Sequence, residues 1–234
     1  MDSMIVYNKI KQIIRLYSTT KFVFLNKFIK NYSKDKIKVL DVGCGNRSPS
    51  ITTSLFPKIE YFGLDKEDYN LTIEDKRILE NRYFHVDLEN LSELDSLLPD
   101  DYFDFIIMAH VIEHTARGVE ILEILAKKLK VGGGIYIEFP SVKSLAFPSM
   151  PGTLNFCDDP THVRLYDIKE VANTLIKCGF KVIKAGTRRN FIRCLLTPMI
   201  LIYQLMKHKK IYGSTFWDIL GLAEFVYAVK IKDA

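Results

Sequence analysis

Seven short runs rich in β-branched and aromatic residues alternate with helical segments, and this order restricts the fold more than any other feature of the chain. The runs span residues 37–42, 60–65, 82–88, 103–110, 133–140, 180–186 and 225–232. Helix candidates lie around residues 49–56, 91–98, 117–130 and 167–177. Strands that alternate with helices form a mostly parallel sheet with helices on both faces. We therefore expect a doubly wound α/β fold.

Two segments extend this pattern. Apolar residues at helical spacing predict two amphipathic helices before residue 32, so residues 1–35 are expected to form a helical lid or flank of a main domain at 36–234. Residues 187–224, between the sixth and seventh strand candidates, are longer than a hairpin needs and rich in apolar side chains. We expect a helical insertion there, which either lines a substrate pocket, docks on a partner or enlarges the core.

Composition limits the class of protein. Hydrophobic residues make up 48% of the 234 residues and charged residues 26%, the balance of a globular domain. The longest apolar stretch, Cys194 to Met206, is too short to span a bilayer. The four cysteines form no C-x-x-C pair, which favours free thiols and a cytoplasmic protein. A net charge of +5 without a central basic block argues against nucleic acid as a partner.

Polar residues gather where the first three strand candidates end. The first ends in "VLDVGCGNRSPS", where Asp41 precedes Gly43 and Gly45, and the next two end at Asp65 and Asp87. Open α/β sheets bind ligands outside the carboxyl ends of their strands, and glycines there let a ligand approach the backbone. Carboxylates at this edge would repel a pyrophosphate, but they suit a ligand with an ammonium group, a sulfonium and ribose hydroxyls.

Five stretches give the chain a family resemblance. The segments "VLDVGCGNRS", "YFGLDKE", "YFHVDLENL", "FDFIIMAHVIEHT" and "LKVGGGIYIEFPS" resemble the class I S-adenosylmethionine-dependent methyltransferases over about residues 36–186, together with the closing strand at 225–232. The resemblance implies a seven-stranded sheet with an antiparallel last strand and S-adenosylmethionine as the cofactor. One departure is Arg47, which stands where the family often has a third glycine.

The resemblance also implies roles for single residues. Asp41, Gly43 and Gly45 would line the methionine end of the cofactor, and Asp65, with Lys66 beside it, would hold the ribose hydroxyls. The remaining cofactor-binding candidates are Asp87 and Leu88 at the adenine, and Ala109 and His110 near the methionine portion through their backbone atoms.

His110, Glu113 and His114 spell H-x-x-E-H, a spacing that supplies zinc ligands in some peptidases when it lies on a helix. Here "FDFIIMA" reads as a buried strand that runs into His110, so the motif straddles a strand end and a loop. We therefore expect no metal site. Within the resemblance, His114 is a candidate general base or substrate contact, and its alternative is a polar residue at a helix start.

A second polar group lies in "NFCDDPTHVRLYDIK". In similar methyltransferases a histidine in this loop lies over the acceptor pocket, so His162 is the second catalytic candidate. Binding groups concentrate in such loops. The substrate-side candidates are Arg164, Tyr166, Phe147 and Phe156, although the two phenylalanines suit core packing equally well.

These observations favour a methyltransferase acting on a small-molecule acceptor. A hydroxyl of a sugar, a glycan precursor or a lipid-linked compound is favoured slightly over a quinone or another aromatic acceptor. Contact with a membrane surface and a monomeric or homodimeric state are compatible with the same sequence. Two alternatives stay open: an inactive S-adenosylmethionine-binding partner protein, and an oxidoreductase with a nucleotide cofactor. The latter is weakened by Asp41 and by Ser48, which replaces the last fingerprint glycine.

Overall fold

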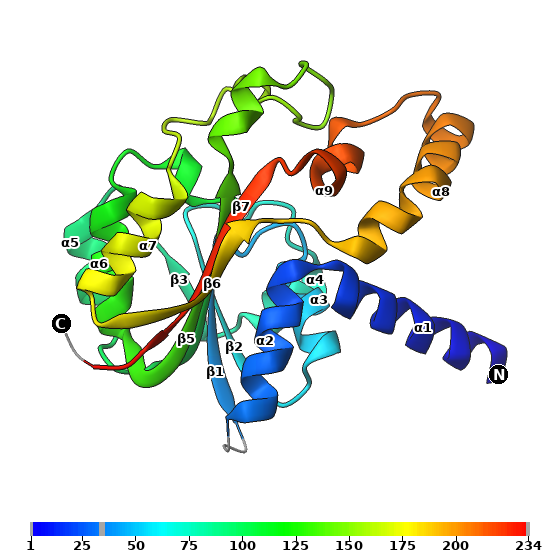
Figure 1. Ribbon diagram of the computed structural model, residues 1–234. Helices are drawn as coiled ribbons and strands as arrows, with labels where there is room; N and C mark the ends of the chain where they lie inside the picture. The colour runs from blue at the N-terminus through cyan, green and yellow to red at the C-terminus, as the bar shows by residue number, and fades with distance from the viewer. Residues whose placement is uncertain (1, 33–35, 233–234) are drawn as a thin grey trace.

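A computed structural model describes the backbone of residues 2–32 and 36–232, and side chains from residue 9 onward within those ranges. Its centre is a seven-stranded sheet in the order β3-β2-β1-β4-β5-β7-β6 (Figure 1). All neighbouring strands are parallel except β7, which is antiparallel to both β5 and β6. The strands are β1 (Ile37–Val42), β2 (Ile59–Asp65), β3 (Tyr83–His85), β4 (Phe103–Ala109), β5 (Leu129–Pro140), β6 (Phe180–Thr187) and β7 (Ala223–Lys230). The expected fold class is confirmed.

Helices cover both faces of the sheet, with α5, α6 and α7 on one side and α2, α3 and α4 on the other (Figure 1). The described helices are α1 (Asp2–Ser18), α2 (Thr20–Asn31), α3 (Ser48–Leu55), α4 (Ile73–Ile78), α5 (Leu91–Leu97), α6 (Gly118–Lys128), α7 (Ile168–Lys177), α8 (Phe191–His208) and α9 (Trp217–Leu220). Short 3₁₀ turns lie at Ile112–His114, Val142–Ala146, Phe156–Asp158 and Gly213–Phe216.

Each face has its own apolar core. Leu40, Ile106 and Ile137 belong to a large buried cluster shared with α5, α6 and α7. On the other face, Phe24 of α2 stacks on Tyr136 with ring centroids 5.5 Å apart, and Phe28 contacts Phe105 at 5.0 Å. Helix α2 is therefore packed directly against the sheet. The expected boundary at residues 35 and 36 falls beside the undescribed residues 33–35 and stays a prediction.

Most elements lie within two residues of their expected bounds, and three differences are larger or unexpected. Strand β3 ends at His85 because Asp87 turns the chain: its carbonyl accepts from the Asn90 amide at 2.9 Å and its carboxylate from the Glu89 amide at 3.0 Å. Strand β5 begins at Leu129, directly after α6 and earlier than residue 133. Helix α4 was not predicted, and its start carries a capping box between Thr72 and Asp75.

The register of the parallel strands brings their carboxyl ends to one edge. Val42 pairs with Leu64 of β2 and Met108 of β4, and Ala109 pairs with Glu138 of β5. The residues that follow these positions therefore meet at one end of the sheet. Between β6 and β7 the chain leaves the sheet, forms α8 and α9, and returns, so that α8 and α1 project from the same side of the domain (Figure 1).

Candidate active site

A cavity of about 1170 Å³ lies at the carboxyl ends of the parallel strands. Nine of the sequence-predicted site residues line it: Gly43, Gly45, Asp65, Lys66, Asp87, Leu88, Ala109, His110 and His114. Residues from α1, α2, α8 and α9 close its other side, including Arg15, Lys21, Arg193 and Trp217. The loop after β5 contributes Asp159, Thr161 and Val163. The volume slightly exceeds the usual range for a small-molecule pocket, which leaves room for two ligands.

The glycine turn after β1 is tightly built. Gly43 has a φ of 72°, its amide donates to the Leu64 carbonyl at 2.7 Å, and a Cβ at this position would lie 2.2 Å from Cγ2 of Val111. Arg47 has a φ of 63°, so the position where the family often has glycine keeps a left-handed backbone. A non-glycine residue there costs about 1–2 kcal/mol. The departure from the family pattern therefore leaves the backbone conformation of the turn in place.

Asp41 lies beneath this turn and does not line the cavity. It is 1% exposed, and its Oδ2 accepts hydrogen bonds from Ser48 Oγ at 2.5 Å and the Tyr61 hydroxyl at 2.7 Å. Burial, and then the Asp41 charge, raises the pKa of Tyr61, so its phenol stays a donor. Lys21 Nζ lies 3.7 Å from the carboxylate. In this structure Asp41 therefore braces the residues of the turn that line the cavity, and its contact with the cofactor stays a prediction.

Asp65, at the end of β2, faces the cavity. Its Oδ2 accepts from the Gly45 amide at 3.2 Å and its Oδ1 from the Glu67 amide at 3.3 Å, which ties the carboxylate to the glycine turn. Burial raises the pKa of Asp65, and hydrogen bonds from backbone amides oppose that shift. Each oxygen still has a lone pair for a ligand hydroxyl.

A largely buried charged cluster forms part of the cavity wall, and most of it was not predicted from the sequence. Glu138 of β5 lies 2.9 Å from His110 Nε2 and accepts hydrogen bonds from Arg188 Nη1, at 2.6 Å, and from the hydroxyl of Tyr136. On its other side, His110 Nδ1 lies 3.2 Å from Glu113 Oε1. The one signal in the sequence was the single acid, Glu138, in the apolar run "GGIYIEFP".

This cluster shifts the protonation of its members. Burial alone would lower the pKa of His110, but the Glu113 and Glu138 carboxylates outweigh it and raise the pKa to about 9. Burial would raise the pKa of Glu138, but Arg188 and His110 hold it well below its usual range. His110 is therefore an imidazolium near neutral pH, between two carboxylates. It also adopts a left-handed φ of 56°, a conformation uncommon outside glycine.

His114 and His162, far apart in the sequence, meet at one end of the cavity. Their ring centroids lie 4.9 Å apart, and only His114 lines the cavity. His114 Nδ1 lies 2.9 Å from Thr161 Oγ1, and His162 Nδ1 lies 2.7 Å from the Phe156 carbonyl oxygen. Together with Glu113 they can present three ligand atoms within 4.8 Å of one another.

The four substrate-side candidates do not line the cavity. Tyr166 is 1% exposed, and its hydroxyl donates to the Thr115 carbonyl at 2.8 Å and accepts from the Gly118 amide at 2.9 Å. Buried in the core in this way, it has no surface left for a substrate, and this expectation is corrected. Arg164 pairs with Glu170 at 2.5 Å, outside the cavity wall.

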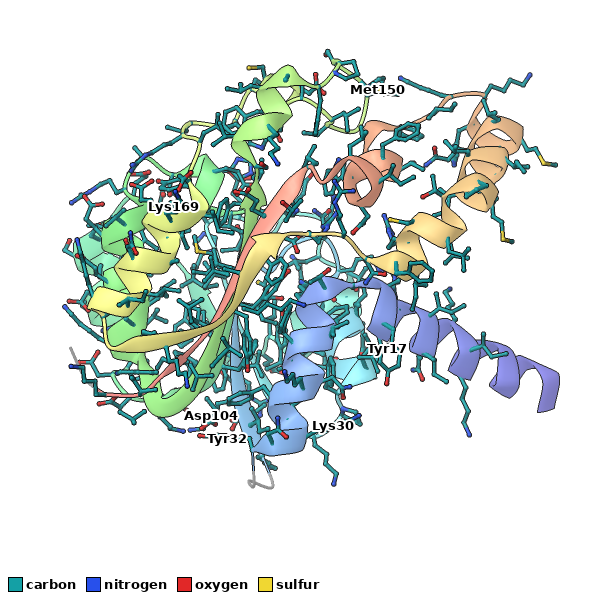
Figure 2. All side chains as sticks on the ribbon, viewed as in Figure 1. Tyr17, Lys30, Tyr32, Asp104, Met150 and Lys169 are labelled. Carbon is teal, nitrogen blue, oxygen red and sulfur yellow. The ribbon has the colours of Figure 1, made fainter. Side chains whose placement is uncertain are left out.

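The two phenylalanines support the loop after β5. The Phe156 ring lies 4.5 Å from the His162 ring, so Phe156 contacts the site through that histidine. Phe147 packs with Met150, labelled in Figure 2, against a small cluster that contains Leu154. Both side chains therefore support the wall of the cavity from outside it, and the aromatic residue that lines it in this region is Trp217.

Comparisons with known proteins agree with this geometry. A family model described as "Methyltransferase domain" matches residues 17–185. A demethylmenaquinone methyltransferase from Halalkalibacterium halodurans is 26% identical over 141 residues, which are 56% of this chain and 58% of that protein. An uncharacterized protein of Methanocaldococcus jannaschii is 29% identical over 100 residues, 42% of this chain and 27% of its own length. The match therefore spans less than two thirds of either relative.

Solved structures share the fold. A SAM-dependent methyltransferase from Archaeoglobus fulgidus superposes with a TM-score of 0.55 at 22% identity, covering 96% of this chain and 99% of that one. An S-adenosylmethionine-dependent methyltransferase from Mesorhizobium loti gives 0.59 at 14% identity, covering 92% and 100%. The family model covers well over half of the chain. The chain therefore belongs to the methyltransferase-domain family and has the fold of these S-adenosylmethionine-dependent methyltransferases.

Proposed function

We propose that this protein methylates a hydroxyl group of a small lipid-linked acceptor at a membrane surface. S-adenosylmethionine, when bound, supplies the methyl group from its sulfonium sulfur. The observation that carries the lipid-linked part of the proposal is an exposed apolar stripe on α8, beside the mouth of the cavity. The relative named as a demethylmenaquinone methyltransferase supports a small-molecule acceptor.

The cavity residues fit this cofactor. The turn at Gly43 and Gly45 lets the methionine end approach the backbone, and the Asp65 carboxylate accepts hydrogen bonds from the ribose hydroxyls. Asp87 and Leu88 would bind the adenine, and the backbone at Ala109 and His110 would border the methionine portion. The Asp65 and Asp87 carboxylates favour a cationic sulfonium ligand over a pyrophosphate. This electrostatic preference supports the assignment over a nucleotide-cofactor oxidoreductase.

His114 and His162 mark the acceptor end in this proposal. Methyl transfer needs acceptor oxygen, methyl carbon and sulfur in line, and a hydroxyl must lose its proton as it reacts. His114 provides an imidazole for deprotonation at the cavity wall, and His162 packs beside it. Thr161 and the Phe156 carbonyl hold their Nδ1 atoms, which orients both rings.

Helix α8 carries an apolar stripe that the described part of the domain does not cover. Its members recur every three or four residues, lie on one face and are between 59% and 79% exposed: Phe191, Leu195, Met199, Ile202 and Met206. Leaving this much apolar surface in water is unfavourable, and such patches mark contacts with proteins or membranes. No described helix has the length and apolar character to span a bilayer. Contact by the stripe would therefore be interfacial.

Helix α1 adds a second apolar face beside the first. Ile10, Ile13, Ile14 and Tyr17 are between 42% and 57% exposed, and the Tyr17 carbonyl accepts a hydrogen bond from Asn190 Nδ2, next to the start of α8. In Figure 2, Tyr17 lies near the corner where α1 meets α2. Arg15 and Arg193, one from each helix, line the cavity.

Exposed lysines flank both apolar faces. Lys9 and Lys11 are on α1, and Lys207, Lys209 and Lys210 follow the stripe of α8. A basic residue near an anionic membrane surface contributes about 1 kcal/mol to binding. Apolar faces flanked by lysines suit an anionic lipid surface better than a second copy of this basic chain. An acceptor anchored in that surface would reach the cavity between α1 and α8.

The test is methyl transfer from labelled S-adenosylmethionine to a panel of hydroxyl acceptors, each offered with and without a lipid anchor in anionic vesicles. The proposal expects transfer to an anchored hydroxyl acceptor at a rate well above that for its soluble counterpart. Equal transfer rates for the anchored and the soluble acceptor would contradict the lipid-linked part of the proposal. Binding of S-adenosylhomocysteine without transfer to any acceptor would favour a non-catalytic partner protein.

A further inference from the structure

The acceptor end of the cavity contains more ligating groups than a general base needs. One imidazole oriented by one hydrogen bond is sufficient to take a proton from a hydroxyl. Here a second imidazole and a buried carboxylate converge on the first, and Glu113, His114 and His162 can place one ligand atom each within 4.8 Å of the others. The three come from the turn after β4 and from the loop after β5, so the fold has to bring them together.

The hydrogen bonds of His162 leave its Nε2 as a ligand atom. A carbonyl oxygen only accepts, so the 2.7 Å contact between His162 Nδ1 and the Phe156 carbonyl requires the proton on Nδ1. In the neutral ring, Nε2 then carries the lone pair. A metal-binding histidine commonly donates its other ring N–H to a backbone carbonyl in this way.

The same reasoning applies to His114. The Thr161 hydroxyl donates to Asp159 Oδ1 at 2.6 Å, so its one proton is committed there. His114 Nδ1, 2.9 Å from that hydroxyl oxygen and 3.2 Å from the Thr161 carbonyl, must therefore be the donor. Its Nε2 lone pair is also left for a ligand. Both imidazoles are in the tautomer that metal binding through Nε2 requires.

Glu113 supplies an independent observation. Its side chain is 1% exposed; Oε1 lies 3.2 Å from His110 Nδ1, and Oε2 is buried without a hydrogen-bond partner among the described residues. A buried carboxylate oxygen without a partner is costly, and few occur in native proteins. A cation bound there would supply the missing partner.

We infer that Glu113, His114 and His162 bind a divalent metal ion of the zinc type at the acceptor end of the cavity. Two imidazoles and one carboxylate are the ligand set of catalytic zinc sites, which keep a further position for water or substrate. Bonds of about 2.0–2.2 Å would draw the three ligand atoms closer than 4.8 Å by small side-chain rotations.

The site differs from the one that the H-x-x-E-H spacing would suggest. That pattern pairs His110 with His114 as ligands. In the structure the His110 ring lies between the Glu113 and Glu138 carboxylates, so it contacts Glu113 as an ion-pair partner. The third ligand, His162, comes from the loop after β5. The inference thus departs from the sequence-based expectation of no metal, which considered the H-x-x-E-H motif at a strand end and did not include His162.

A consequence for catalysis rests on the proposed function. With the ion bound, both imidazoles would be ligands and would no longer act as bases. An acceptor hydroxyl at the free position of the ion would be acidified and would release its proton to water. Metal binding itself does not depend on that step, and it can be measured without any acceptor.

The experiment is calorimetric titration of the metal-free protein with Zn²⁺, paired with the visible absorption spectrum of the Co²⁺ form. The wild type should bind about one ion per chain and give the intense bands of a four- or five-coordinate site. His162→Gln and Glu113→Gln should each lower affinity by at least about 100-fold, the upper end of what loss of a supporting residue costs. The matched controls are His85→Gln and His208→Gln, which should bind as the wild type does.

Three outcomes would overturn the inference: unchanged affinity in His162→Gln, loss of affinity in the control variants, or no binding below millimolar Zn²⁺. If Glu113→Gln does not fold, as judged by S-adenosylhomocysteine binding, His114→Gln on the partly exposed loop replaces it and should show the same loss. Metal binding without methyl transfer would leave the metal site standing and reject the proposed function, whereas transfer unaffected by complete metal removal would leave only a structural ion.

Discussion

The Glu138 carboxylate of β5 lies 2.6 Å from Nη1 of Arg188, a residue 50 positions later in the chain, and both side chains are almost fully buried. Arg188 follows β6, so this ion pair joins the middle of the sheet to the start of the segment that carries α8. Its Nε also lies 3.3 Å from Asp218 Oδ1 of α9. One guanidinium therefore holds the wall of the cavity against the sheet.

Removing that guanidinium should leave two carboxylates without their main cation. We expect Arg188→Met to lower the free energy of unfolding by about 3–5 kcal/mol, the usual cost of removing one partner from a buried ion pair. Urea denaturation followed by circular dichroism measures it. Arg189→Met is the control, because the Arg189 side chain bonds only a backbone carbonyl among its described partners. Similar losses in both variants would contradict a special role for the Glu138 pair.

Glu138 should also give the protein a specific dependence on pH. Its pKa is held below the usual value, so its charged form stabilises the fold above its unfolded pKa of about 4.3, and this contribution is lost as pH falls toward the folded pKa. The difference in unfolding free energy between the wild type and Glu138→Gln should be constant near neutral pH and shrink progressively below about pH 4.3. Denaturation curves of both proteins from pH 7 to pH 3 measure this difference in unfolding free energy. A difference that grows as the pH falls would contradict the prediction.

The turn at Gly43 permits a comparison between two glycines. Gly43 and Gly132 both have positive φ, 72° and 84°, but an added Cβ meets Val111 at 2.2 Å in the first case and nothing within 4 Å in the second. Both alanine variants incur the left-handed penalty of about 1–2 kcal/mol. Gly43→Ala should cost about 1–3 kcal/mol more, from overpacking. Thermal melts of the two variants measure the difference, and equal shifts would mean that Val111 moves aside freely.

Asp65 should carry much of the cofactor affinity. In the proposed function its carboxylate accepts hydrogen bonds from the ribose hydroxyls, so we expect Asp65→Ala to weaken binding of S-adenosylhomocysteine by about 1–3 kcal/mol. Calorimetry on the folded variant gives the value. Asp68→Ala is the control, because Asp68 is exposed, pairs with Lys76 at 2.6 Å and lies outside the cavity wall. Wild-type affinity in Asp65→Ala would remove this residue from the site.

Sequence reasoning predicted the sheet well and the cavity in part, for physical reasons. Buried strands are apolar runs with clear ends, and parallel strands bring those ends together, so the sequence alone places Asp65 and Gly45 at one edge of the sheet. Glu138 lacks such a pattern, because one acid in an apolar strand does not reveal which cation it meets. Tyr166 was misjudged because a tyrosine in a polar loop has the same local sequence whether its ring is buried or exposed.

The positions of the site residues in the loops depend on contacts between segments that are distant in the sequence. The meeting of His114 and His162 requires the loop after β5 to fold back over the turn after β4, where the amides of Val163 and Arg164 donate to the Glu113 carbonyl at 2.8 and 3.2 Å. These hydrogen bonds are formed by backbone groups and leave no trace in residue type. The sequence could therefore nominate both histidines but could not show that Glu113 lies with them.

The α8 stripe should control membrane binding. Leu195→Gln with Met199→Gln removes two apolar side chains that are 67% and 68% exposed, so stability should change by less than about 0.5 kcal/mol per site. Complete burial of a side chain of this kind contributes about 1.5–3 kcal/mol of favourable free energy. Partial insertion should still lower binding to anionic vesicles by at least about tenfold in a sedimentation assay. The control is Ile73→Gln on α4, an equally apolar residue that is 83% exposed and outside the stripe. Wild-type vesicle binding by the double variant would show that the stripe serves another partner.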